Sequence, residues 1–147
     1  MSGTKISYTF LMEPPHFFGK IAVKALIVKD GTVLIVRDRR DADTWEFPGG
    51  RINEQEGMEE ALHREAQEEI GVDITIGRLV DSSQGIHGMD GNPYLFVAFE
   101  ATLVEPSQPL SIPSDELAEA KWIGPDAIDE QRMNEQCRHA LLKYWNL

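Results

Sequence analysis

The sequence of 147 residues contains one cysteine, Cys137, so it can form no internal disulfide bond and no site built from several thiolates. It has no apolar run approaching the 18 residues that a membrane-spanning helix requires. Its N-terminus lacks the basic and then apolar pattern of a secretory signal. These absences predict a cytoplasmic protein that makes no contact with a membrane.

Positive charge is also scarce, since the chain has 14 Lys and Arg residues but 25 Asp and Glu residues, for a net charge of −11. Duplex nucleic acid attracts basic surfaces, so this balance argues against it as a partner. An anionic small molecule would need local help from arginines or from a metal ion. The chain has no internal repeat, and its length suits one domain with a proper core, so we expect residues 1–147 to form a single domain.

Much of the negative charge lies in a segment with the composition of a helix. From Glu54 to Ile70 there is no proline and a single glycine, and Gly71 stands where such a helix would end. At about 100° per residue, one face of this helix is apolar at its start and acidic at its end. That face carries Met58, Ala61, Leu62, Glu65, Glu68 and Glu69.

The position of three glutamates on the apolar face calls for a counter-charge. Like charges at i,i+3 or i,i+4 cost about 0.2–0.5 kcal/mol per pair, which a purely solvated acidic helix would avoid. Carboxylates at the edge of a core suit a hard divalent cation, typically Mg²⁺. We therefore predict a metal site at Glu65, Glu68 and Glu69. Without metal, Glu68→Gln should stabilise the protein by about 1 kcal/mol, because it relieves repulsion.

The same segment resembles a named signature, the Nudix box G-x5-E-x7-R-E-U-x-E-E-x-G-U. Every charged and glycine position of that pattern is matched by residues 50–72, GRINEQEGMEEALHREAQEEIGV. The one departure is Ala66, where a larger aliphatic residue is usual. The preceding WEFPGG, residues 45–50, extends the likeness toward MutT-type members. So many fixed positions at fixed spacing make the resemblance specific.

The resemblance implies a fold, an activity and a set of residue roles. The fold would be the Nudix α/β/α sandwich, with a mixed β-sheet between helices. The reaction would be Mg²⁺-dependent hydrolysis of a pyrophosphate bond in a nucleoside diphosphate linked to a group X, with Mn²⁺ as a substitute. Glu65, Glu68 and Glu69 would be catalytic, with Glu65 as our choice of base, and the Gly49 carbonyl would join them as a metal ligand. Glu116 or Glu119 would supply a further ligand.

Other residues would support the site or bind the substrate. By the same resemblance, Glu56 and Arg64 form a structural pair that braces the loop on the helix. Four arginines beside the predicted metal site are candidates for binding a substrate phosphate. They are Arg37, Arg39, Arg40 and Arg51.

Several readings of the function stay open at this point. WEFPGG favours a free nucleotide, an NTP or dNTP, over the alternative of an NDP-sugar or ADP-ribose type compound. A non-catalytic, nucleotide-binding regulatory domain of the same fold would be expected to lose box carboxylates, which this chain retains. An acidic Ca²⁺-binding or interaction protein would need neither Arg64 nor the Gly-Gly loop. The protein is expected to be a monomer or a homodimer, for which an N-terminal arm at residues 6–12 could serve.

The flanking sequence predicts the rest of the secondary structure. Two apolar, β-branched runs are joined by Lys29-Asp30-Gly31, and Asp-Gly between strands predicts a hairpin. The expected strands are 20–28, 32–37, 45–47, 73–80, 94–104 and one within 114–124. The polar, glycine-rich stretch 82–92 is expected to be a loop. A final amphipathic helix should carry Met133, Cys137, Ala140, Leu141 and Tyr144 on one face.

Overall fold

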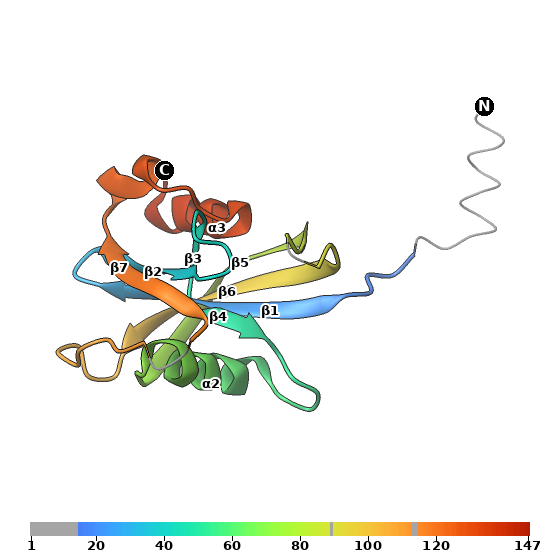
Figure 1. The fold of residues 1–147 in the computed structure, drawn as a ribbon, viewed down its shortest axis with the longest axis horizontal. Helices are drawn as coiled ribbons and strands as arrows, with labels where there is room; N and C mark the ends of the chain where they lie inside the picture. Colours follow the sequence, from blue (N-terminus) through green and yellow to red (C-terminus); the bar gives the residue numbers. More distant parts are fainter. Residues whose placement is uncertain (1–14, 89, 113–114) are drawn as a thin grey trace.

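The computed structural model describes residues 15–88, 90–112 and 115–147, so the arm expected at residues 6–12 lies outside the described part. A β-sheet separates helix α2 on one face from η1 and α3 on the other (Figure 1). This is the predicted sandwich of a sheet between helices. The elements in chain order are β1 (Lys20–Lys29), β2 (Thr32–Asp38), β3 (Trp45–Glu46), β4 (Gly49–Arg51), α2 (Met58–Ile70), β5 (Ile74–Ile86), β6 (Pro93–Leu103), β7 (Leu117–Ile123), η1 (Pro125–Glu130) and α3 (Glu135–Trp145).

Strand β1 is the centre of the sheet, whose main order is β3-β2-β1-β6-β5. It runs parallel to β6 and antiparallel to β4, and its end pairs with β2. Strand β7 pairs with β2, so the sheet is mixed as expected. The predicted hairpin between β1 and β2 is present, with positive φ at both Asp30 (51°) and Gly31 (77°).

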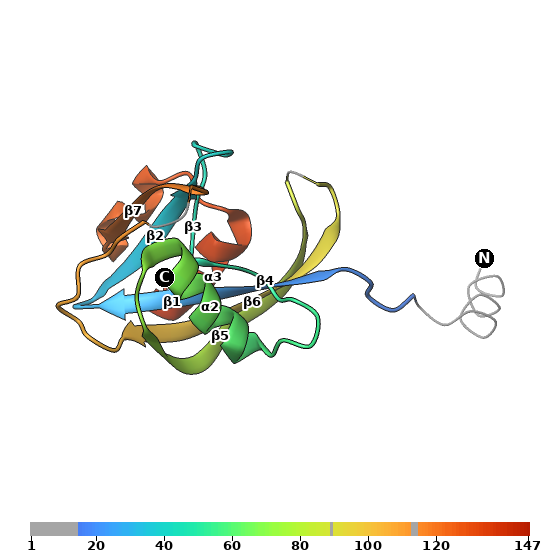
Figure 2. The same cartoon turned by 60° about the horizontal axis from the view of Figure 1, so that its bottom comes forward.

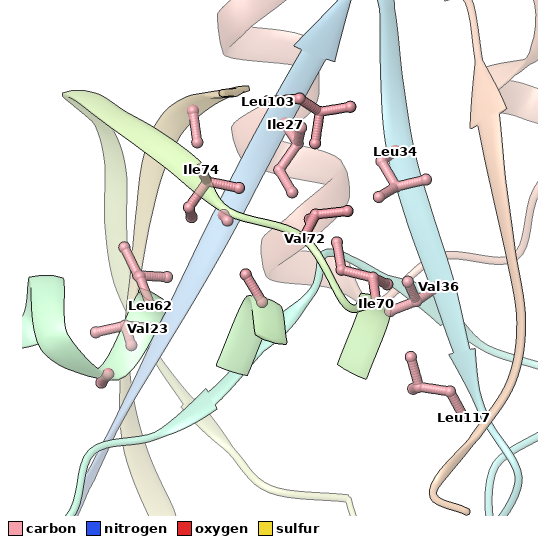
Figure 3. Close-up of a cluster of buried hydrophobic side chains, with 14 of the residues drawn as sticks. Val23, Ile27, Leu34, Val36, Leu62, Ile70, Val72, Ile74, Leu103 and Leu117 are labelled. Carbon is pink, nitrogen blue, oxygen red and sulfur yellow. The ribbon is translucent and has the colours of Figure 1, made fainter. Parts of the chain in front are cut away.

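The sheet has a hydrophobic core on each face, because alternate residues of a strand point to opposite sides. Figure 3 shows the core on the α2 side, where Val23 and Ile27 of β1 pack near Leu62 and Ile70. The core on the α3 side contains Leu26 and surrounds the buried Cys137. Among the described residues, no helix is long and apolar enough to cross a membrane.

Helix α2 crosses the lower face of the sheet, which Figure 2 brings to the front. It begins at Met58 rather than at Glu54, because Gln55 has a positive φ of 63° that a helix cannot accommodate. It ends as predicted at Gly71, which adopts the left-handed conformation and donates its N–H to the helix. Ala66, the departure from the box pattern, is buried in the core.

Strand β5 is longer than the sequence indicated. It continues through residues 82–86, which were expected to be part of a loop, and pairs with β6 as far as Ile86 opposite Pro93. Two register shifts near Leu79 interrupt the pairing. The length of β6 explains the extension, because it offers backbone partners to a polar segment that has no strand pattern of its own. The resulting hairpin forms one wall of the cavity described below.

Candidate active site

A cavity of about 940 Å³ lies where α2, β4, the β2–β3 loop and the β5–β6 hairpin meet. Most of the residues predicted for the site line this cavity. They are Arg40, Gly49, Arg51, Arg64, Glu65, Glu68, Glu69 and Glu116. Carboxylates and guanidinium groups therefore share one volume, although they come from distant parts of the sequence.

Gly49 and Gly50 allow the acidic part of α2 to approach the sheet. Gly49 has φ of +144°, and a Cβ there would lie 2.1 Å from the Val23 carbonyl oxygen. A Cβ at Gly50 would instead lie 2.4 Å from a carboxylate oxygen of Glu65. The backbone N–H of Gly49 donates to Glu69 Oε1 at 2.8 Å. Gly50 thus lies against the carboxylate of Glu65, and Gly49 donates a hydrogen bond to Glu69.

Arg64 binds a carboxylate of the loop before α2 and two carboxylates of α2 itself. Its Nε and Nη2 atoms donate to Glu56 at 2.7 and 2.9 Å, which is the pair implied by the resemblance. Its Nη1 atom also donates to Glu65 Oε1 at 2.9 Å and to Glu68 Oε2 at 3.2 Å. The hydrogen bonds from Arg64 lower the pKa of Glu56 to about 2. Arg64 therefore supplies a counter-charge to Glu65 and Glu68, two of the three glutamates for which the sequence suggested a metal ion.

Glu69 and Lys24 are two buried ionisable residues that line the cavity. Glu69 is 6% exposed and Lys24 is 8% exposed. Burial raises the pKa of Glu69 to about 8, against the opposing effects of Lys24 and the Gly49 N–H. Burial alone would lower the pKa of Lys24, but the Glu46 carboxylate beside it holds that pKa above its ordinary value. The sequence reasoning missed Lys24, although a lysine inside an apolar strand is an unusual feature.

The donor atoms fit a divalent cation in type but are occupied by protein partners. Carboxylate and carbonyl oxygens are the ligands that Mg²⁺ prefers. Within the described residues, however, no group of three or more His, Cys, Asp and Glu side chains is placed to hold a metal ion. Glu65 and Glu68 bind Arg64, and Glu69 binds the Gly49 N–H. Their use as ligands requires these side chains to exchange partners.

The four candidate arginines divide into two pairs. Arg40 and Arg51 line the cavity, where Arg40 pairs with Asp38 at 2.9 Å and Arg51 pairs with Asp90. Arg37 and Arg39 are not among the lining residues.

The second pair instead joins the β2–β3 region to its neighbours. Arg37 donates to the Ala42 carbonyl and to Glu119, at 2.8 and 2.9 Å. Arg39 donates to the Leu117 carbonyl at 2.9 Å. The contact with Arg37 also separates the two acids considered as a further ligand, because Glu119 is held there while Glu116 lines the cavity.

Comparison with known proteins places this geometry in a family. The model of the NUDIX domain matches residues 20–144. The chain is 30% identical over 112 residues to a MutT-like protein of Streptomyces ambofaciens, a match covering 76% of this chain and 68% of that protein. It is 38% identical over 65 residues to the CTP pyrophosphohydrolase of Escherichia coli (strain K12), covering 42% of this chain. That match spans about half of the E. coli protein, 48% of its length.

The fold agrees with the sequence match. A NUDIX hydrolase from Nitrosomonas europaea superposes with a TM-score of 0.74 at 22% identity, over 88% of this chain and 90% of that one. The likeness thus covers the sheet and the helices on both of its faces. Because the domain match runs from the first residue of β1 into the last turn of α3, the chain belongs to the Nudix family.

Proposed function

We propose that this protein hydrolyses a pyrophosphate bond in a nucleoside diphosphate linked to X, with Mg²⁺ as its cofactor and Mn²⁺ as a substitute. The observation that carries the proposal is the composition of one cavity. It joins the oxygen donors of α2 and β4 to the guanidinium groups of Arg40 and Arg51. A pyrophosphate carries several negative charges, so a site for it needs cations on more than one side.

The oxygen donors would hold the divalent cation. We assign this role to Glu65, Glu68, Glu69 and the Gly49 carbonyl. Glu116 is the better candidate for an additional ligand, because Glu119 is already paired with Arg37. When bound, the cation offsets phosphate charge and lowers the pKa of a water molecule.

The remaining roles belong to side chains at the cavity wall. Glu65 is our candidate for the general base, since its carboxylate lies against Gly50 at the wall of the cavity. Arg40 and Arg51 offer forked N–H donors that match phosphate oxygens. Each is now paired with an aspartate, so the substrate would compete with Asp38 and Asp90 for them. Arg64 would keep the loop before α2 in place.

The preferred substrate is a free nucleotide, an NTP or dNTP. The segment WEFPGG favours this class, and one relative is named for hydrolysis of CTP. NDP-sugars and ADP-ribose form the alternative class. The two classes differ in their products, because an NTP would give a nucleoside monophosphate and pyrophosphate, whereas an NDP-sugar would give a monophosphate and a sugar phosphate.

A product screen tests the proposal. The purified protein is incubated with NTPs, dNTPs, NDP-sugars and ADP-ribose in Mg²⁺, in Mn²⁺ and in chelator, and products are separated with and without added phosphatase. We expect metal-dependent release of pyrophosphate from one or more NTPs. Turnover of NDP-sugars alone would move the protein to the alternative class. Binding of nucleotides without turnover of any compound would favour a regulatory domain, and binding of Ca²⁺ without either would favour an acidic interaction protein.

A further inference from the structure

Lys24 is a buried lysine in the middle of β1 that the proposed chemistry does not use. Its side chain is 10% exposed, and it lies among the residues at the cavity wall. A buried ammonium group requires nearby acceptors or negative charge. Its Nζ atom lies 3.2 Å from Glu46 Oε2, on β3. A charged side chain is thus kept inside the sheet at the point where the sheet meets the cavity.

The alkyl chain of Lys24 lies directly against Gly49. The two residues are cross-strand partners in the antiparallel pair of β1 and β4. A Cβ on Gly49 would come within 2.8 Å of Lys24 Cα and 3.0 Å of Lys24 Cδ. Gly49 in turn donates its N–H to Glu69 Oε1 at 2.8 Å. A movement of the Lys24 side chain would therefore be transmitted to Gly49 and to the hydrogen bond that holds Glu69.

The ammonium group is also the partner of a carboxylate at the edge of the site. Glu69 is 6% exposed, and the side chain of Glu46 is 30% exposed. Where water is partly excluded, the attraction between opposite charges is stronger than in water. Without the ammonium, Glu46 would lose its counter-charge. Its carboxylate, and the backbone of Gly49 against which the Lys24 side chain packs, would then be expected to move.

We propose that Lys24 is a positioning residue that acts through Glu46 and Gly49. Its ammonium group offsets the Glu46 carboxylate, and its alkyl chain supports the strand that presents the Gly49 carbonyl and N–H. Lys24 does not touch the reacting atoms in this assignment. The inference rests on the proposed function, because it gives Lys24 a part in the same site.

The experiment compares four variants with the wild type. Lys24→Met keeps the length of the side chain and removes its charge, and Glu46→Gln removes the paired carboxylate. The double variant completes a double-mutant cycle. Lys29→Met is the matched control, because Lys29 lies at the far end of the same strand, where its exposed Nζ atom donates to the Pro106 carbonyl at 2.7 Å.

Two quantities are measured on each protein. Hydrogen exchange of the Gly49 amide is followed by NMR in chelator, which needs neither metal nor substrate. The values of kcat and KM are measured in Mg²⁺ with the best compound of the product screen. We expect Lys24→Met to speed Gly49 exchange and to lower kcat, each by about tenfold, with KM nearly unchanged. In the Glu46→Gln background the same change should cost at least about fivefold less, and Lys29→Met should alter neither quantity.

Other results would overturn the proposal. A higher KM with unchanged kcat would make Lys24 a substrate contact instead. Equal losses with and without the Glu46 charge would make it a packing residue. If Lys24→Met does not fold, the double variant must fold and keep the Gly49 exchange rate of Glu46→Gln, and its failure to do so would equally reject the assignment. A wild type that hydrolyses none of the compounds would defeat the proposed function alone, because the amide exchange would still report whether Lys24 positions Gly49.

Discussion

Arg64 donates two hydrogen bonds to Glu56, from Nε to Oε2 at 2.7 Å and from Nη2 to Oε1 at 2.9 Å. Glu56 belongs to the loop before α2, whereas Arg64 lies more than one turn after the start of the helix. The same guanidinium donates to the Arg51 carbonyl at 3.1 Å, so it fastens both the loop and β4 to α2. The metal site proposed above therefore depends on a contact that itself involves no metal.

The first prediction concerns the removal of this guanidinium. Arg64→Ala should lower the melting temperature and weaken Mg²⁺ binding, because it leaves neighbouring carboxylates without a counter-charge. Arg64→Lys should restore only part of both, since a point charge cannot replace a planar fork. Thermal melts and titration calorimetry measure the two effects. An unchanged melting temperature and Mg²⁺ affinity in Arg64→Ala would contradict the supporting role.

The second prediction concerns pH. Because Arg64 lowers the pKa of Glu56 from 4.5 to about 2, the pair stabilises the folded state above pH 4.5 and loses this effect as the pH falls toward 2. Glu56→Gln should therefore flatten the fall in melting temperature over that range. Glu59→Gln, at an exposed position in the first turn of α2, serves as the control and should show the same fall in melting temperature as the wild type. If the melting temperatures of the wild type and Glu56→Gln fall equally over that pH range, the Glu56–Arg64 pair does not stabilise the folded state as proposed.

The third prediction contrasts the two adjacent glycines. Gly49→Ala places a Cβ against the backbone of β1, which cannot move aside, so we expect it to prevent normal folding. Gly50→Ala meets only the carboxylate of Glu65, which can rotate away. We expect this variant to fold and to lose most of its activity. Circular dichroism and turnover measure the contrast, and a fully active Gly50→Ala protein would show that the position of Glu65 does not matter.

The fourth prediction concerns Glu69. Glu69→Gln keeps the volume of the side chain and its hydrogen bond from Gly49, and replaces a carboxylate of the proposed ligand set with a neutral amide. Turnover should fall by about two orders of magnitude or more, while the melting temperature in chelator is kept or raised. Reaction of the wild type in ¹⁸O-labelled water should place the label in one phosphate-containing product. Full activity of the variant, or no label in either product, would reject the hydrolytic mechanism.

The fifth prediction revises an expectation drawn from the sequence. Repulsion among the three glutamates suggested that Glu68→Gln would stabilise the metal-free protein. The structure instead gives Glu68 a counter-charge in Arg64, at 3.2 Å, with its side chain 57% exposed. Since exposed ion pairs contribute little, we now expect a change of less than about 0.5 kcal/mol in chelator. In saturating Mg²⁺ the wild type should be the more stable protein, because only it keeps the full ligand set. Urea unfolding in both conditions makes the comparison, and a large stabilisation in chelator would restore the original argument.

Features set by local chemistry were predictable from the sequence. Asp30-Gly31 allows the positive φ angles of a tight hairpin, and Gly71 allows the left-handed end of α2. The spacing of apolar residues placed α2 and α3 on the core. The resemblance to the Nudix box also implied the pair of Glu56 and Arg64, which lie within a single loop–helix unit. In each case the determining residues are neighbours in the chain.

Features that depend on the pairing of distant strands were decided by the tertiary structure. The sequence did not show that β6 would extend β5 through Ile86, because the partner of a strand is not encoded in its own pattern. From the sequence, the four arginines were equivalent candidates for phosphate binding. In the structure, Arg37 and Arg39 bind β7 instead of lining the cavity. The sequence left Lys24 unnoticed, because the pairing of β1 with β4 is what brings that lysine against Gly49. Spacing along the chain determined which groups α2 presents, whereas the charges that meet them were determined by strands far away in sequence.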